Sequence, residues 1–162
     1  MKYRYHLEES IQVKASPEDV FNFANDHKQL SSHMNQSSWM MGGGSMKTIF
    51  DAQKGKKVGS HIKMQGKVFG IELYLDEVVS EYNSPYKKEW HTVGSPKLLV
   101  IGQYRMGIEI QAAGLGSELK VFIDYNLPET GISKLFSLLF GNMYAKWCVK
   151  QMINSVHDHY ER

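Results

Sequence analysis

The chain contains one cysteine, so Cys148 has no partner for an internal disulfide bond. Small exported domains commonly depend on several such bonds. The charged, apolar and small-residue series typical of a secretory signal does not precede Tyr3. We therefore expect a protein of the reducing cytoplasm, with Cys148 as a buried apolar thiol rather than a nucleophile.

Long apolar runs and a strong excess of one charge are also missing. The longest uncharged apolar stretch, residues 135–145, lies between Lys134 and Lys146 and is about half of what a membrane span requires. The formal net charge is +2, and both signs are spread along the chain. A nucleic-acid-binding surface needs a dense basic patch. We therefore expect neither a transmembrane segment nor a nucleic-acid partner.

Spacings that hold metals or nucleotides are absent as well. The seven histidines never fall at a metal-binding spacing, and His157 and His159 would point to different sides of a helix. The glycines at residues 42–44 lack the lysine-serine pair and the strand-to-helix context of a phosphate loop. The sequence therefore predicts no metal and no other cofactor.

What the chain does contain is a regular alternation of apolar and polar residues. It predicts a strand over residues 3–13 and six more over residues 47–52, 60–69, 71–82, 87–93, 98–112 and 117–127. Short turns separate the six later strands, for example at Gly94-Ser95-Pro96, and leave no room for crossover helices. A seven-stranded antiparallel meander with one apolar face and one polar face is the simplest topology.

Three helices are expected around this sheet. Ser16, Pro17 and the two following acids are typical of a helix start, and this helix should end near residues 25–26. A second short helix is expected over residues 27–34. After residue 131, apolar residues recur every three to four positions and predict one long helix, which buries this stripe against the sheet: Ile132, Leu135, Phe136, Leu139, Phe140, Met143, Tyr144, Trp147, Met152, Ile153, Val156 and Tyr160.

This order of elements resembles the helix-grip fold of the START/polyketide-cyclase-like (SRPBCC) superfamily. Residues 11–21 resemble the family's first strand running into a Pro-Glu-x-Val-Phe helix start, and residues 78–85 resemble its valine-rich strand before a proline turn. Residues 114–119 resemble its Gly-x-Gly-Thr turn, with Ser117 in place of threonine. Leu127-Pro128, followed by residues 144–149, looks like the closing helix of bacterial polyketide cyclase/dehydrase and lipid-transport-like members.

The resemblance covers nearly the whole chain and implies an α+β fold in a single START-like domain over residues 1–162. Its parts would be a curved seven-stranded antiparallel sheet, two short helices and a long C-terminal helix. It also implies an apolar cavity between sheet and helix, which holds lipids, sterols, polyketides or plant-hormone-like molecules in the family. Some members catalyse cyclisation and many only bind, so the fold does not choose between these functions.

Two acids, Glu9 and Glu77, fall at apolar positions of their strands. A carboxyl group buried there would have a raised pKa and would serve as a general acid or base, or as an anchor for a ligand. The alternatives are a strand-end position in water or a bulge that turns the side chain outward. Glu9 and Glu77 are therefore weak candidates for catalysis.

The same alternation and the helical stripe predict the lining of the cavity, and the alternative for each single side chain is packing in the core. The predicted lining comprises Leu73, Leu75, Glu77, Trp90, Tyr104, Met106, Ile108, Tyr125, Leu139, Met143 and Trp147. Trp39, Met40, Met41 and Gly43 are predicted to form an entrance loop, because apolar side chains flank glycines there. The competing interpretation is a plain structural loop.

We therefore expect a protein that binds a small or medium apolar ligand, such as a lipid, a sterol or a polyketide-like molecule, rather than an enzyme. The first alternative is a polyketide cyclase/dehydrase-like enzyme that uses the same cavity. The second is a stress-related or toxin-like protein that binds another macromolecule. A perturbed acid in an enclosed pocket favours the enzyme, and a purely apolar pocket favours carriage.

Overall fold

The structure is a computed structural model, and it describes residues 2–26, 45–68, 70–129 and 131–161. The second short helix expected over residues 27–34 lies outside the described residues, as do Trp39, Met40, Met41 and Gly43 of the expected entrance loop.

The described residues form a seven-stranded antiparallel sheet with two helices, α1 and α4. The strands are β1 (Tyr5–Val13), β2 (Ser45–Phe50), β3 (His61–Val68), β4 (Ile71–Asn83), β5 (Lys87–Lys97), β6 (Tyr104–Ala113) and β7 (Gly116–Tyr125). Strands β2 to β7 follow one another as a meander, and β1 pairs with β7. The predicted α+β fold with an antiparallel sheet is confirmed.

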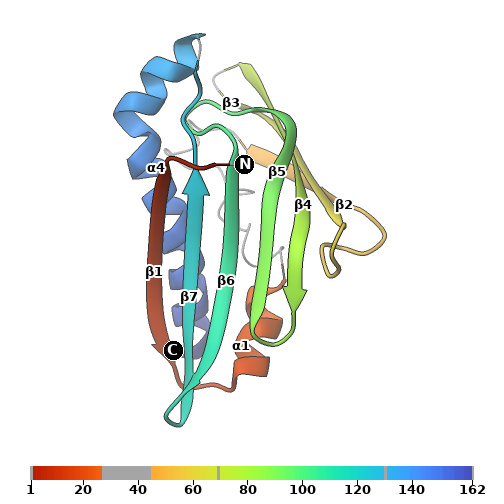
Figure 1. Cartoon of the computed structure of the whole chain (residues 1–162), viewed down its shortest axis with the longest axis vertical. Helices are drawn as coiled ribbons and strands as arrows, with labels where there is room; N and C mark the ends of the chain where they lie inside the picture. Colours follow the sequence, from red (N-terminus) through yellow and green to blue (C-terminus); the bar gives the residue numbers. More distant parts are fainter. Residues whose placement is uncertain (1, 27–44, 69, 130, 162) are drawn as a thin grey trace.

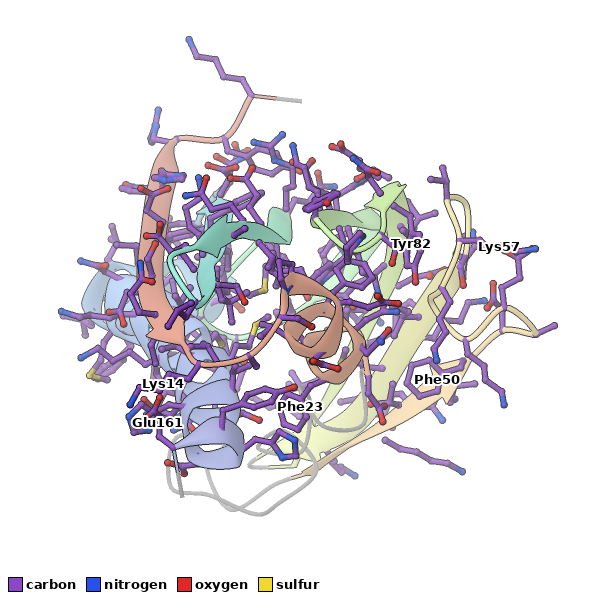
Figure 2. All side chains as sticks on the ribbon, turned by 90° about the horizontal axis from the view of Figure 1, so that it is seen from below. Lys14, Phe23, Phe50, Lys57, Tyr82 and Glu161 are labelled. Carbon is purple, nitrogen blue, oxygen red and sulfur yellow. The ribbon has the colours of Figure 1, made fainter. Side chains whose placement is uncertain are left out.

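The short helix α1 (Pro17–Ala24) follows β1 as the sequence predicts. The Ser16 hydroxyl accepts a hydrogen bond from the Asp19 amide at 3.2 Å and so caps the helix start. Asn25 caps its end. Phe23 points toward the end of α4, where its ring stacks on His159 with centroids 4.2 Å apart (Figure 2). The helix thereby closes one end of the space beside the sheet.

The long helix α4 (Gly131–Tyr160) packs along β1 and β7, and its first turns project beyond the start of β1 (Figure 1). Its second half follows the prediction, because Met152, Ile153 and Val156 are buried. Its first half does not. The side chains expected in the stripe are exposed there, at 40 to 68 %, namely Leu135, Phe136, Leu139, Phe140 and Met143.

In the first half of α4, small residues rather than these large apolar side chains face the rest of the protein. Ser137 and Gly141 are buried on this side, and Ala145 follows one turn later. A Cβ atom on Gly141 would lie 2.7 Å from Cδ2 of Leu127 and 3.0 Å from the carbonyl oxygen of Val100. The backbone of α4 therefore approaches the underlying loop as closely as a glycine allows. Among the described residues, no helix is long and apolar enough to cross a membrane.

Strand β5 differs from the prediction, because it continues through Gly94-Ser95-Pro96 instead of turning there. Asp76 of β4 pairs with Val93 of β5, and Tyr74 pairs with Lys97. A step of two residues along β4 therefore corresponds to a step of four residues along β5. The extra β5 residues form a bulge, and Gly94 takes a φ of 68° within it. Residues 98–103, predicted to begin the next strand, form an irregular segment under α4 instead.

The outer face of the sheet is polar, as alternation predicts. Nη2 of Arg105 donates to Oδ2 of Asp124 at 2.6 Å, and Nζ of Lys120 lies 2.5 Å from Oε2 of Glu109. Phe122 is an exception on this face, since it is only 5 % exposed. Its ring fills the space above Gly107, where a Cβ atom would lie 2.5 Å from the ring.

We predict that Gly107→Ala destabilises the protein, because the added methyl group would overlap the Phe122 ring and force the two strands to adjust. The free energy of unfolding in urea should fall by about 1 to 3 kcal/mol. In a Phe122→Ala background the same substitution should cost clearly less. Equal costs in both backgrounds would show that the Gly107–Phe122 contact does not limit residue 107.

Candidate functional site

Glu77 lies on the inner face of the sheet, as alternation predicts, and is 2 % exposed. It stands between Leu75 and Val79 on β4, each only 1 % exposed. Its Oε1 atom accepts a short hydrogen bond from the hydroxyl of Tyr104 on β6. Its Oε2 atom is buried and has no hydrogen-bond partner among the described residues. One half of the carboxylate is therefore satisfied and the other half is not.

Tyr104 is held in place by Thr92 on the neighbouring strand β5. The Thr92 hydroxyl accepts a hydrogen bond from the Tyr104 amide at 3.1 Å and donates one to the Tyr104 carbonyl oxygen at 3.4 Å. The last register pair of β5 with β6 is His91 with Arg105. Just beyond it, the two Thr92 hydrogen bonds link the strands in place of backbone pairing. Neighbouring strands thus position the carboxyl group of Glu77 and its donor.

Lys88 is a second buried ionisable residue on this face. It lies two positions from Trp90 on β5, so both side chains point inward, and it is 1 % exposed. Its Nζ atom donates to Oδ1 of Asn25 at 2.8 Å and lies 5.7 Å from the centre of the Trp90 indole. Asn25 in turn donates to the hydroxyl of Tyr82 at 2.8 Å. The end of α1 therefore holds the lysine against aromatic rings.

The pKa values of these two groups shift toward neutrality from opposite sides. Burial raises the pKa of Glu77 from 4.5 to about 7, while the Tyr104 hydrogen bond, the charge of Lys88 and a hydrogen bond from Trp90 oppose this rise. Burial lowers the pKa of Lys88 from 10.5 to about 7, and the charge of Glu77 opposes this fall. Both protonation states of each group are therefore accessible near neutral pH.

Helix α4 contributes Tyr144 and Cys148 to the same surroundings. Burial, and then the neighbouring Cys148, raise the pKa of Tyr144 well above its usual value. Burial raises the pKa of Cys148 to about 12, with a further contribution from the charge of Glu77. A thiol with such a pKa is almost wholly protonated near neutral pH, so Cys148 is not an activated nucleophile. This agrees with the sequence-based interpretation.

Glu9 occupies a different place from Glu77. It is half-buried on β1, where it pairs with Val121 of β7. Strands β7, β6 and β5 separate β1 from β4. The two glutamates that alternation singled out do not form a pair, whereas Glu77 and Lys88 influence each other's charge.

The remaining residues of the predicted lining divide by element. All those on the sheet are buried, namely Leu73, Leu75, Trp90, Tyr104, Met106, Ile108 and Tyr125. On α4, Trp147 is half-buried, while Leu139 and Met143 are exposed at 68 and 44 %. The expectation that these last two face the sheet is wrong, because Gly141 and Ser137 occupy that side. That the other residues line a ligand cavity remains a prediction.

Sequence reasoning missed Lys88 and Asn25. The signal for Lys88 was present, because a residue two positions from an inward Trp90 must share its face. Asn25 reaches Lys88 across 63 positions of sequence, and no local pattern indicates such a contact. Within the described part of the chain, no group of three or more His, Cys, Asp and Glu side chains could hold a metal ion.

Neither a family model nor a curated protein matches this sequence. Solved structures do match its fold. The Zhui aromatase/cyclase from a Streptomyces species has a TM-score of 0.68 at 10 % identity, over 98 % of this chain and 94 % of its own. The chain shares the helix-grip fold of this enzyme. The fold that the sequence resemblance implied is therefore confirmed.

Two further solved structures show the same helix-grip architecture. A truncated norcoclaurine synthase from Thalictrum flavum has a TM-score of 0.63 at 15 % identity, over 94 % of this chain and 90 % of its own. A protein from Chromobacterium violaceum has a TM-score of 0.62 at 17 % identity, over 97 % of each chain. At such identities the likeness concerns the fold, and the site has to be argued from this chain's own residues.

The raised pKa of Glu77 should make stability depend on pH. The folded state holds this proton more tightly than the unfolded state, whose pKa is near 4.5, so the free energy of unfolding should fall as pH rises from about 4.5 to about 7. A shift of this size corresponds to on the order of 3 kcal/mol. Glu77→Gln should remove the decrease, as measured by urea denaturation at several pH values.

Glu9→Gln is the matched control, since it removes a half-buried carboxylate from the same face of the sheet. This variant should keep the wild-type decrease. Identical pH dependence in the wild type and in Glu77→Gln would show that Glu77 does not titrate in this range.

Proposed function

We propose that the protein binds a small or medium apolar ligand that carries a hydrogen-bond donor, between the inner face of the sheet and α4. Glu77 is the anchor. The observation that carries this proposal is the buried Oε2 atom of Glu77, which lacks a partner among the described residues. Leaving a buried acceptor unpaired costs about 1 to 3 kcal/mol, and more when it is charged. A hydroxyl or amine of a ligand would recover this cost.

The surroundings of Glu77 suit an apolar molecule. Leu75, Val79 and Trp90 are almost fully buried on the same face, so a ligand there would meet apolar surface with a few fixed polar groups. The structurally similar Zhui aromatase/cyclase and norcoclaurine synthase carry the names of enzymes that act on small molecules. Their likeness supports a small-molecule ligand for this chain, in the lipid, sterol or polyketide-like class.

A second candidate function is catalysis at the same place, as in a polyketide cyclase. The observation that favours it is the pair of opposite pKa shifts at Glu77 and Lys88, each to about 7. A general acid and a general base work best with pKa values near the working pH. The Tyr104 hydroxyl, which donates its proton to Oε1 of Glu77, would hold the carboxyl group in position.

The binding proposal is tested with two probes that differ by one hydroxyl group, 2-naphthol and naphthalene, by titration calorimetry at pH 8. At this pH Glu77 is mostly ionised, so its free oxygen accepts a bond from the naphthol. The wild type should bind 2-naphthol about 10-fold more tightly than naphthalene. Glu77→Leu should bind both probes equally, because it keeps the apolar surface and lacks the acceptor.

Glu9→Leu is the control for this experiment and should keep the wild-type preference. A preference that survives in Glu77→Leu would exclude Glu77 as the anchor. Failure of the wild type to bind either probe would contradict ligand binding at this face.

The catalytic candidate predicts that a linear 1,5-diketone, whose ring closure needs both an acid and a base, cyclises faster with the protein than in buffer. The rate should peak near pH 7, since Glu77 and Lys88 both titrate there. Glu77→Gln and Lys88→Met should each remove the peak, as followed by chromatography of the product. A wild-type rate equal to the buffer rate would exclude this reaction and leave binding as the function.

A further inference from the structure

The first three turns of α4 expose a row of large apolar side chains. Leu135, Leu138 and Leu139 are 62, 65 and 68 % exposed. We call these three residues the leucine surface. Phe136 and Phe140 continue it along one flank, at 43 and 40 % exposure. Single exposed leucines are ordinary, but a contiguous apolar surface usually marks a contact with something outside the molecule.

The leucine surface is confined to one end of the helix. Positions 139, 146 and 150 lie on one side of α4, because they are spaced by seven and four residues. Leu139 is followed on this side by the exposed Lys146 and Lys150. Met143, which is 44 % exposed, is the last apolar residue on this side before these lysines. The first turns, which carry the leucine surface, project beyond the start of β1 (Figure 1).

Basic side chains border this surface. A groove of about 860 Å³ lies between the start of β1, residues 126–129 and the first turns of α4. Lys2, Arg4 and Lys134 line it, together with Leu138 of the leucine surface and one acid, Glu129. We use the name basic groove for the side chains of Lys2, Arg4 and Lys134 that line it.

The charges of the basic groove differ from the ion-paired cations on the outer face of the sheet. On the outer face of the sheet, Lys87, Arg105 and Lys120 each form ion pairs with Asp or Glu. Lys2, Arg4 and Lys134 form no ion pair with any residue that the structure describes. The first turn of α4 also has no acid, and its N-terminal amides add a positive partial charge. This end of the molecule therefore presents an excess of positive over negative charge beside apolar surface.

We propose that this end of the protein docks on the surface of an anionic lipid bilayer. The leucine surface enters the boundary between headgroups and acyl chains, and the basic groove pairs with lipid phosphates. An apolar helix face bordered by lysine and arginine is the arrangement that binds bilayers in this way. The unpaired cations select for negative lipids, because each adds attraction to a negative surface.

The experiment is flotation of the purified protein with vesicles, either of phosphatidylcholine alone or of phosphatidylcholine with 30 % phosphatidylserine, at two salt concentrations. The wild type should float with the anionic vesicles and bind neutral ones at least 10-fold more weakly. Changing the leucine surface to serine (Leu135→Ser, Leu138→Ser, Leu139→Ser) should weaken anionic binding at least 10-fold. Reversing the basic groove (Lys2→Glu, Arg4→Glu, Lys134→Glu) should have a similar effect and abolish the salt dependence.

Matched control variants change exposed residues elsewhere. Leu115, in the turn between β6 and β7 at the opposite end of the molecule (Figure 1), and Val58 are exposed, and their replacement by serine should leave binding unchanged. The same holds for Lys47→Glu, Lys56→Glu and Lys57→Glu taken together. Circular dichroism confirms that each variant folds, which is expected because all these side chains face solvent.

Three outcomes would overturn the proposal. The first is absence of wild-type binding to anionic vesicles, and the second is equal binding to both kinds of vesicle. The third is a wild-type dimer in sedimentation analysis that Leu135→Ser, Leu138→Ser and Leu139→Ser convert to a monomer, since the leucine surface would then pair with a second copy of this chain.

Discussion

The close contact between α4 and the segments beneath it at Val100 and Leu127 determines the arrangement of much of this protein. Gly141 brings the helix backbone against the carbonyl oxygen of Val100 and the side chain of Leu127. A helix that presents Gly141 and Ser137 to its support must present Leu135 and Leu139 to the opposite side. The exposed leucine surface is therefore a consequence of the rotation that this contact imposes on α4.

The rotation also determines which side chains of α4 approach the interior. Tyr144 and Cys148 lie on the side where the charge of Glu77 affects their pKa values. Further along the helix, Val149 and Met152 complete the apolar contact. One helix thus combines a surface directed away from the protein with a buried side near the only strongly perturbed acid among the described carboxyl groups.

Glu77 and Lys88 depend on each other energetically. Burial disfavours the charged form of both, and each charge partly offsets the cost of the other. The pair is held by neutral donors and acceptors, with Tyr104 on the carboxylate and Asn25 on the ammonium group. Because Asn25 also ends α1, the position of that helix and the state of the lysine are linked. Apolar residues of similar volume would avoid these desolvation costs, so stability alone does not account for the pair. Binding of a ligand would account for it.

Much of the sheet could be predicted from sequence, because period-two alternation directly reports which side of a strand is buried. Glu77, Trp90 and Tyr104 lie on the inner face as alternation requires. Lys88 shares that face by the same rule, although a lysine is rarely expected there. The bulge in β5 could not be predicted, because Gly94 and Pro96 are equally typical of a turn.

The misplaced strand start at Leu98 and the misjudged face of α4 share one physical cause. Residues 98–103 are apolar enough to read as strand, yet they leave the sheet and lie beneath the first half of α4, where Ile101 is 2 % exposed. Apolar residues surround that half of the helix, so periodicity alone cannot select its buried side. The buried side is determined by Val100 and Leu127, which pack into the space that the absent side chain of Gly141 leaves. The missing glycine side chain, rather than the apolar stripe, marks the contact.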